Sequence, residues 1–188
     1  MPGDMDATVE IAPETVEYQA HQELPLPGRY ELNPARLVAE PSVRALRWPV
    51  VRGRFKCRRG HLVLGEASEL ALELDAGSLR TNIFGLAGTL TKEGGLCAAD
   101  YPAIRFRSTD MLVMPGRSIE VVGRLDVLDT VRDLRLKGKL AYVDELAVVV
   151  WLTGVLPPPR RQFENGRWIA QVLGERRIHI ELAAEFVR

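Results

Sequence analysis

The sequence predicts an all-β fold whose antiparallel strands close into a barrel. Apolar and polar residues alternate with a period of two in one segment after another, which is typical of strands with one face in a core and the other in water. The one stretch with room for a helix, roughly residues 84–99, contains four glycines that keep any helix short. Closure into a barrel is favoured over a sandwich because a barrel has no exposed strand edges.

Six segments carry the alternation most clearly. In chain order they are residues 51–57, 69–74, 104–108, 119–127, 134–140 and 178–186. Residues 129–133 suit a hairpin connection between two of these strands. Gly53, Gly123 and Gly138 lie within predicted strands, where glycine suits the sharp coiling of barrel corners and leaves space inside.

The length of 188 residues suits a single domain with a sizeable core. Residues 1–27 are acidic and contain prolines, and we interpret them as an N-terminal tail or surface arm. Residues 28–188 then form the barrel domain.

The overall charge does not indicate a nucleic acid or an anionic membrane as partner, because 25 basic and 25 acidic side chains cancel. A local patch could still bind either one. A net charge near zero also weakens repulsion between copies, so a homodimer is allowed.

The sequence predicts a cytoplasmic protein without a membrane span. Its longest fully apolar run, residues 146–152, is far shorter than the roughly 20 residues of a spanning helix. The N-terminus has neither the basic nor the apolar region of a secretory signal. Cys57 and Cys97 are therefore interpreted as free thiols, with a disulfide as the alternative.

Four motifs, in order along the chain, resemble those of the YceI-like family of polyisoprenoid-binding, lipocalin-like proteins. Residues 51–55 followed by 60–62 resemble its V-x-G-x-F…G-x-L hairpin, and residues 75–81 resemble its D-x-x-S-x-x-T corner. Residues 101–108 are similar to its Y-P-x-I-x-F-x-S strand, and residues 121–125 resemble its V-x-G-x-L strand. The resemblance covers roughly residues 28–145.

The resemblance implies an extended eight-stranded lipocalin-like barrel with one short helical connection. It also implies a non-catalytic binding or carrier protein that holds a long isoprenoid-like chain, as in an isoprenoid quinone or a prenyl phosphate, and needs no cofactor. An eight-stranded barrel is just wide enough to hold one such ligand or to be filled by its own side chains.

The candidate ligand-binding residues are the large apolar residues on the inward side of the predicted strands. They are Phe55, Leu62, Leu72, Leu74, Ile104, Phe106, Ile119, Val121, Leu125, Leu136, Ile180, Leu182 and Phe186. The alternative is a barrel filled by these side chains, which acts as an interaction or accessory protein through its outer surface. A cavity on the order of 300–1,000 Å³ would favour the carrier.

Arginines and a lysine alternate along residues 52–58 and form a basic stripe. Arg52 and Arg54 are candidate contacts for a ligand headgroup, because arginine suits bidentate phosphate binding. A nucleic-acid groove is a second interpretation, although no aromatics are interleaved and no basic excess is present. A solvated outer face paired with Glu69 and Glu73 is the third.

We predict no catalytic residue and no metal site. No G-x-S-x-G elbow, P-loop or G-x-G-x-x-G motif is present. The three histidines do not cluster, whereas zinc requires three or four convergent ligands. An enzyme with a hydrophobic substrate remains a further alternative, and it would need a cluster of titratable groups facing the lumen.

Overall fold

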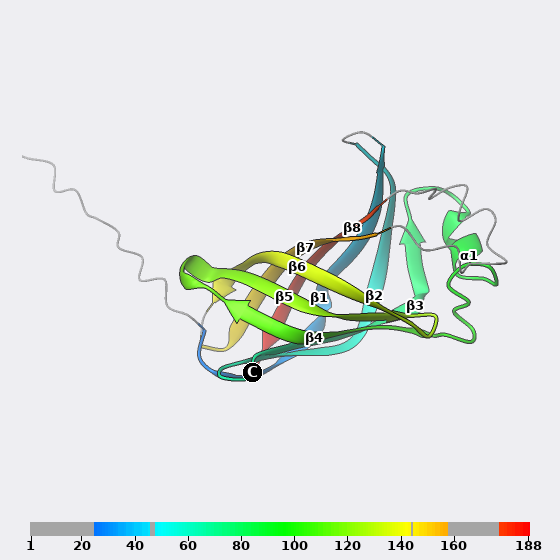
Figure 1. Cartoon of the computed structure of the whole chain (residues 1–188). Coiled ribbons are helices and arrows are strands. Elements are labelled where there is room, and N and C mark those ends of the chain that lie inside the picture. The colour runs from blue at the N-terminus through cyan, green and yellow to red at the C-terminus, as the bar shows by residue number, and fades with distance from the viewer. Residues whose placement is uncertain (1–24, 46–47, 144, 158–176) are drawn as a thin grey trace, which may run out of the picture.

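The chain folds into a closed barrel of eight antiparallel strands, as a computed structural model shows for residues 25–45, 48–143, 145–157 and 177–188 (Figure 1). The strands are β1 (Gly28–Ala45), β2 (Trp48–Leu64), β3 (Glu69–Thr81), β4 (Ala103–Val113), β5 (Ser118–Val127), β6 (Thr130–Val143), β7 (Ala147–Leu156) and β8 (Ile178–Val187). This confirms the predicted fold class. Most of the predicted N-terminal arm, residues 1–27, lies outside the described residues.

Each strand pairs with its neighbour in the sequence, and β1 closes the barrel on β8. The alternation did not single out β1 or β7 as strands. β1 is irregular: its register with β2 breaks between Glu31 and Ala39, and Pro34, which has no N–H to donate, lies in that interval. β7 is apolar at nearly every position, so the alternation is hidden there.

The connection between β5 and β6 is shorter than the sequence predicted. Val127 pairs with Thr130, so only Leu128 and Asp129 form the turn, with φ of 56° and 54°. Two successive residues with positive φ form the tight hairpin turn that matches the twist of a sheet. The prediction that residues 129–133 form the connection was therefore wrong, because 130–133 belong to β6.

One end of the barrel is closed by its own side chains. The most deeply buried large residues there come from neighbouring positions on β1–β3 and β5–β8. They are Tyr30, Leu62, Leu70, Ile119, Leu140, Val148 and Phe186, each 1% exposed or less. In Figure 1 this is the end that carries the C-terminus and the β4–β5 turn, opposite α1.

Of the three glycines that the sequence analysis placed within strands, two leave no space inside the barrel. A Cβ on Gly123 would lie 2.5 Å from the carbonyl oxygen of Arg107, and one on Gly138 would overlap the carbonyl oxygen of Trp151. These glycines therefore allow close approach of neighbouring strands. Gly53 differs, because it lines the cavity described below.

The short helix α1 (Leu86–Leu90) lies within the β3–β4 connection, where the sequence predicted it. Ala87 and Leu90 pack against the barrel core from its other end. In the part of the chain that the structure describes, no helix is long and apolar enough to cross a membrane.

Candidate functional site

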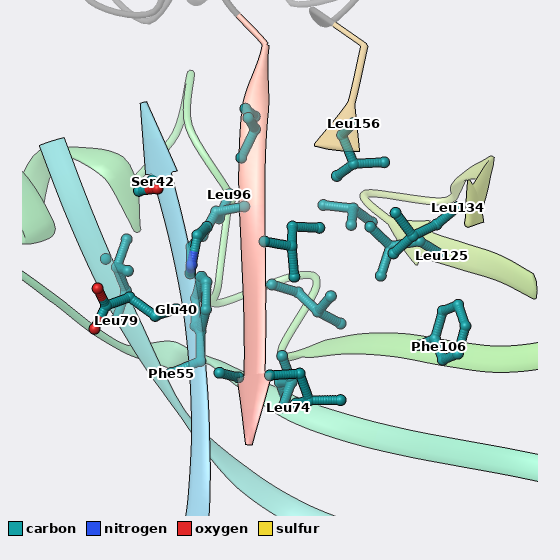
Figure 2. A pocket seen from close by; sticks show the side chains of 18 of the residues that line it. Glu40, Ser42, Phe55, Leu74, Leu79, Leu96, Phe106, Leu125, Leu134 and Leu156 are labelled. Carbon is teal, nitrogen blue, oxygen red and sulfur yellow. The ribbon is translucent and has the colours of Figure 1, made fainter. Parts of the chain in front are cut away.

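A cavity of about 370 Å³ occupies the end of the barrel beside α1. All eight strands contribute to its wall, and Leu90 and Leu96 of the β3–β4 connection contribute as well. Figure 2 shows aliphatic side chains, among them Leu74 and Leu125, arranged around a common space. The volume lies in the range that ligand pockets occupy, roughly 300–1,000 Å³. The lumen at this end is therefore open and apolar.

Nine of the thirteen candidate ligand residues line this cavity. They are Phe55, Leu72, Leu74, Ile104, Phe106, Leu125, Leu136, Ile180 and Leu182. The structure thus brings together residues from β2, β3, β4, β5, β6 and β8 that are distant in the sequence. Their role in binding a ligand stays a prediction.

The other four candidates do not line the cavity. Leu62, Ile119, Val121 and Phe186 are 1% exposed or less and belong to the closed part of the core. Alternation in sequence identifies the inward face of a strand, but it does not tell where along the strand the core is filled. Including these four in the site was therefore wrong for this cavity.

Few polar side chains line the cavity, and Arg132 of β6 is the one cation among its described lining residues. Its Nη1 donates a hydrogen bond to the carbonyl oxygen of Pro157, at 3.5 Å. Sequence reasoning missed Arg132 because it assigned the residue to a turn. The signal was present, since Arg132 lies two residues before Leu134 and so continues the inward positions of β6.

Arg52 and Arg54 do not line the cavity. They occupy exposed positions on β2 and approach the carboxylate of Glu40 on β1, at 3.9 and 3.5 Å. Glu40 itself is among the lining residues. Arg52 and Arg54, the predicted headgroup contacts, therefore lie on the outer face of the barrel and not in the wall of this cavity.

Arg58 of the basic stripe and its neighbour Arg59 form ion pairs on the outer surface, and Arg58 Nη2 lies 3.4 Å from Asp75 Oδ1. Arg59 Nη2 lies 2.8 Å from Glu73 Oε2, and Arg105 Nε lies 3.3 Å from the same oxygen. The hydrogen bond from Arg59, more than that from Arg105, lowers the pKa of Glu73. Glu69, the other predicted partner, pairs with His61 and Arg107 instead. Most of the basic stripe therefore lies on an outer face of the barrel where its charges are paired with carboxylates.

The described thiols and histidines do not gather at the cavity. Cys57 and Cys97 are free thiols. Cys57 lies against the carbonyl oxygens of Arg59 and Glu73, and burial raises its pKa, which disfavours the reactive thiolate. Burial, followed by the charge of Arg44, lowers the pKa of His179. Over the described ranges, no three His, Cys, Asp or Glu residues converge as metal ligands would.

Comparison with protein families gives one match. The model of the YceI-like domain matches residues 30–186, which extends the resemblance beyond the part recognised in the sequence, roughly 28–145. No curated protein matches the sequence.

Several solved structures share the fold at low sequence identity. BcnA of Burkholderia cenocepacia has a TM-score of 0.62 at 16% identity, and the alignment covers 82% of this chain and 98% of that one. A polyisoprenoid binding domain from Saccharophagus degradans has a TM-score of 0.58 at 15% identity, over 84% and 97% of the two chains. The YceI protein of Campylobacter jejuni has a TM-score of 0.60 at 17% identity, over 76% and 89%.

Proposed function

Because the chain belongs to the YceI-like domain family, we propose that it is a non-catalytic binding protein that holds a long apolar chain, of the isoprenoid kind, in its barrel. The observation that carries the proposal is the apolar cavity of about 370 Å³ at one end of the lumen. The polyisoprenoid binding domain of Saccharophagus degradans, which has the same fold, supports the choice of ligand class.

Apolar burial supplies the binding energy. Each CH₂ group that leaves water for an apolar wall contributes ~0.8 kcal/mol, so even a few isoprene units gain several kcal/mol before ordering costs are subtracted. The wall offers aliphatic side chains such as Leu72, Leu125 and Leu182 along the length of such a chain. The closed core around Leu62 and Phe186 sets the depth to which the chain can enter.

A polar headgroup would remain at the open end, next to Arg132. The guanidinium offers several N–H donors, which suits a phosphate or the carbonyl oxygens of a quinone ring. Arg132 thereby takes the place that sequence analysis gave to Arg52 and Arg54.

The character of the wall supports binding rather than catalysis. Among the described residues that line the cavity there is no histidine and no cysteine. The carboxylate of Glu40 is near Arg52 and Arg54 on the outer face. General acid–base chemistry needs a titratable group within hydrogen-bond reach of the substrate, and the apolar wall does not present a cluster of them.

Mass spectrometry of an organic-solvent extract of the purified protein tests the proposal. We expect a quinone, a prenyl phosphate or a related long chain at a stoichiometric amount. A blank extract, repeated after incubation with isoprenoid quinones and prenyl phosphates, would contradict the proposal and leave the outer surface as the place of function. The predicted cytoplasmic location and homodimer are proposed with it, and cell fractionation and sedimentation test them.

A further inference from the structure

Phe84 is the most exposed large apolar residue in the described part of the chain, at 104% of its reference exposure. It lies in the turn after β3, which ends at Thr81, at the open end of the barrel where the β3–β4 connection begins. Its backbone is held in a turn, because the carbonyl oxygen of Ile83 accepts hydrogen bonds from Thr81 Oγ1 at 2.9 Å and from the amide of Leu86 at 3.3 Å. An ordered turn thus presents an aromatic ring to the surroundings.

Asn82 fixes this turn to the beginning of β2. Its amide and its side-chain oxygen bond the backbone of Arg52, at 3.2 and 2.8 Å, and its Nδ2 donates to the carbonyl oxygen of Val50, at 3.3 Å. Val50, Ile83 and Phe84 are all exposed and are brought together by these bonds. We call these three residues the apolar rim. Exposed apolar residues are ordinary when they are scattered, but these gather beside the opening of an apolar cavity.

Three arginines lie behind the apolar rim on the outer face. Arg52 and Arg54 follow Val50 at alternate positions of β2, and Arg80 of β3 lies directly opposite Arg54. Like charges that face each other across two strands destabilise a sheet. Glu40 is the one carboxylate that lies near Arg52 and Arg54 in the described ion pairs. The arrangement therefore costs stability and leaves an excess of positive charge next to the rim.

We propose that the apolar rim and these three arginines dock the open end of the barrel onto an anionic lipid bilayer. A strand rises about 3.3 Å per residue, so Arg52 lies about 7 Å and Arg54 about 13 Å behind Val50. Interfacial elements bury their apolar face ~5–10 Å into the boundary between headgroups and acyl chains. With the rim inserted to that depth, the guanidinium groups reach the level of the lipid phosphates.

Acidic side chains outnumber basic ones around the β5–β6 turn on the other side of the opening, where Arg132 is the one cation between Asp126 and Asp133. Asp126, Asp129 and Asp133 lie on or beside the β5–β6 turn. The bilayer is therefore approached in a tilted orientation, with β2 and β3 nearest the lipid. The inference rests on the proposed function in one respect, since the membrane is where the barrel would collect or deliver an apolar chain.

Flotation with lipid vesicles tests the docking. Wild-type protein should float with vesicles of phosphatidylcholine and phosphatidylglycerol in equal parts, less with pure phosphatidylcholine, and less as salt is added, because salt screens exposed charges. Phe84→Ser should weaken binding about tenfold, since the ring loses its burial in the interface. Replacing Arg52, Arg54 and Arg80 by Gln should weaken it about fivefold per arginine.

Two matched variants control for general effects of exposed residues. Leu112→Ser removes an apolar side chain that is 57% exposed near the closed end, and the triple variant R135Q/K137Q/K139Q removes three exposed cations from β6. Both should float like wild type. The inference would be overturned if the two controls reduced flotation as much as the rim variants do. It would also be overturned if Phe84→Ser changed the oligomeric state but kept its binding to vesicles.

Loading from detergent solution separates this inference from the proposed function. A protein that takes up an isoprenoid from detergent but ignores anionic vesicles would overturn the docking inference and leave the binding function standing. A protein that floats with vesicles and loses this property in the rim variants, but never takes up a chain, would support docking and contradict the binding function.

Discussion

Arg132 of β6 donates a hydrogen bond to the carbonyl oxygen of Pro157, directly after the end of β7, at 3.5 Å. This contact holds a guanidinium at the opening of an apolar cavity. Arg132→Gln should therefore weaken the binding of a prenyl phosphate about tenfold and leave that of the matching prenol unchanged, because the charged hydrogen bond serves only the phosphate. Isothermal titration with both ligands measures the difference. Arg124→Gln, an exposed site on β5, is the control, and an equal loss for both ligands would contradict a headgroup contact.

Leu74→Trp should block the lumen. Leu74 is partly buried and lines the cavity, so the larger ring would occupy space that a ligand needs. We expect ligand uptake to fall at least tenfold while the fold is kept, because the ring enters space that is not already packed. Leu112→Trp, on the outside near the closed end, should bind like wild type. Quenching of protein fluorescence by a quinone measures uptake, and undiminished binding by Leu74→Trp would place the ligand elsewhere.

Leu62→Ala should lower the free energy of unfolding by about 2–5 kcal/mol, because Leu62 is completely buried in the closed end. Ligand bound per folded molecule should not change, since Leu62 does not line the cavity. Leu74→Ala should cost less stability, because its side chain already borders open space. Urea unfolding compares the two variants, and an equal loss of stability would contradict the division of the lumen into a filled and an open part.

Gly138→Ala should destabilise the barrel by about 3 kcal/mol or more, because the new Cβ would overlap the backbone of Trp151 on β7. Gly88→Ala in α1 is the comparison. A Cβ there meets no atom within 4 Å, and alanine favours a helix over glycine by roughly 0.5–1 kcal/mol, so stability should stay the same or rise. The midpoints of thermal unfolding compare the two variants. A Gly138→Ala protein as stable as wild type would show that β6 and β7 can move apart.

Glu73 should contribute to a loss of stability in acid. Its pKa in the folded protein is lowered, first by the hydrogen bond from Arg59. The ionised carboxylate therefore stabilises the fold fully above its unfolded-state pKa, and this contribution is lost as the pH falls below that value through the lower folded-state pKa. Glu73→Gln should be less stable than wild type at neutral pH and should lose less stability on acidification. Parallel urea curves at neutral and acidic pH check this, and identical pH dependence would contradict it.

The inward faces of the strands were predictable from sequence because alternation reports directly which side chains leave water. The sequence did not predict where along the strands the cavity lies. Phe186 and Leu182 belong to the same alternating series on β8, yet only Leu182 borders the cavity. The difference depends on how side chains from several strands fill each level of the barrel, and a single strand carries no signal of that packing.

Arg132 shows a second kind of limit. Its position at the opening depends on a turn of two residues with positive φ, formed by Leu128 and Asp129. The first position of this turn is occupied by Leu128 and not by glycine or asparagine, the usual residue types for such φ angles. Sequence analysis therefore placed the turn too late and assigned an inward-facing strand residue to a loop.

A lumen that is filled at one end and open at the other is a blind tube. Whatever enters must leave by the same opening, so exchange is a reversal of entry rather than passage through the barrel. Such a tube discriminates by length. A molecule shorter than the tube leaves part of the apolar wall without contact. A molecule longer than the tube keeps its last units in water. The position of the closed core around Leu62 and Phe186 therefore determines which chain length binds best. Shifting the boundary of the closed core by a single layer of side chains would change the preferred chain length of the ligand without altering the opening.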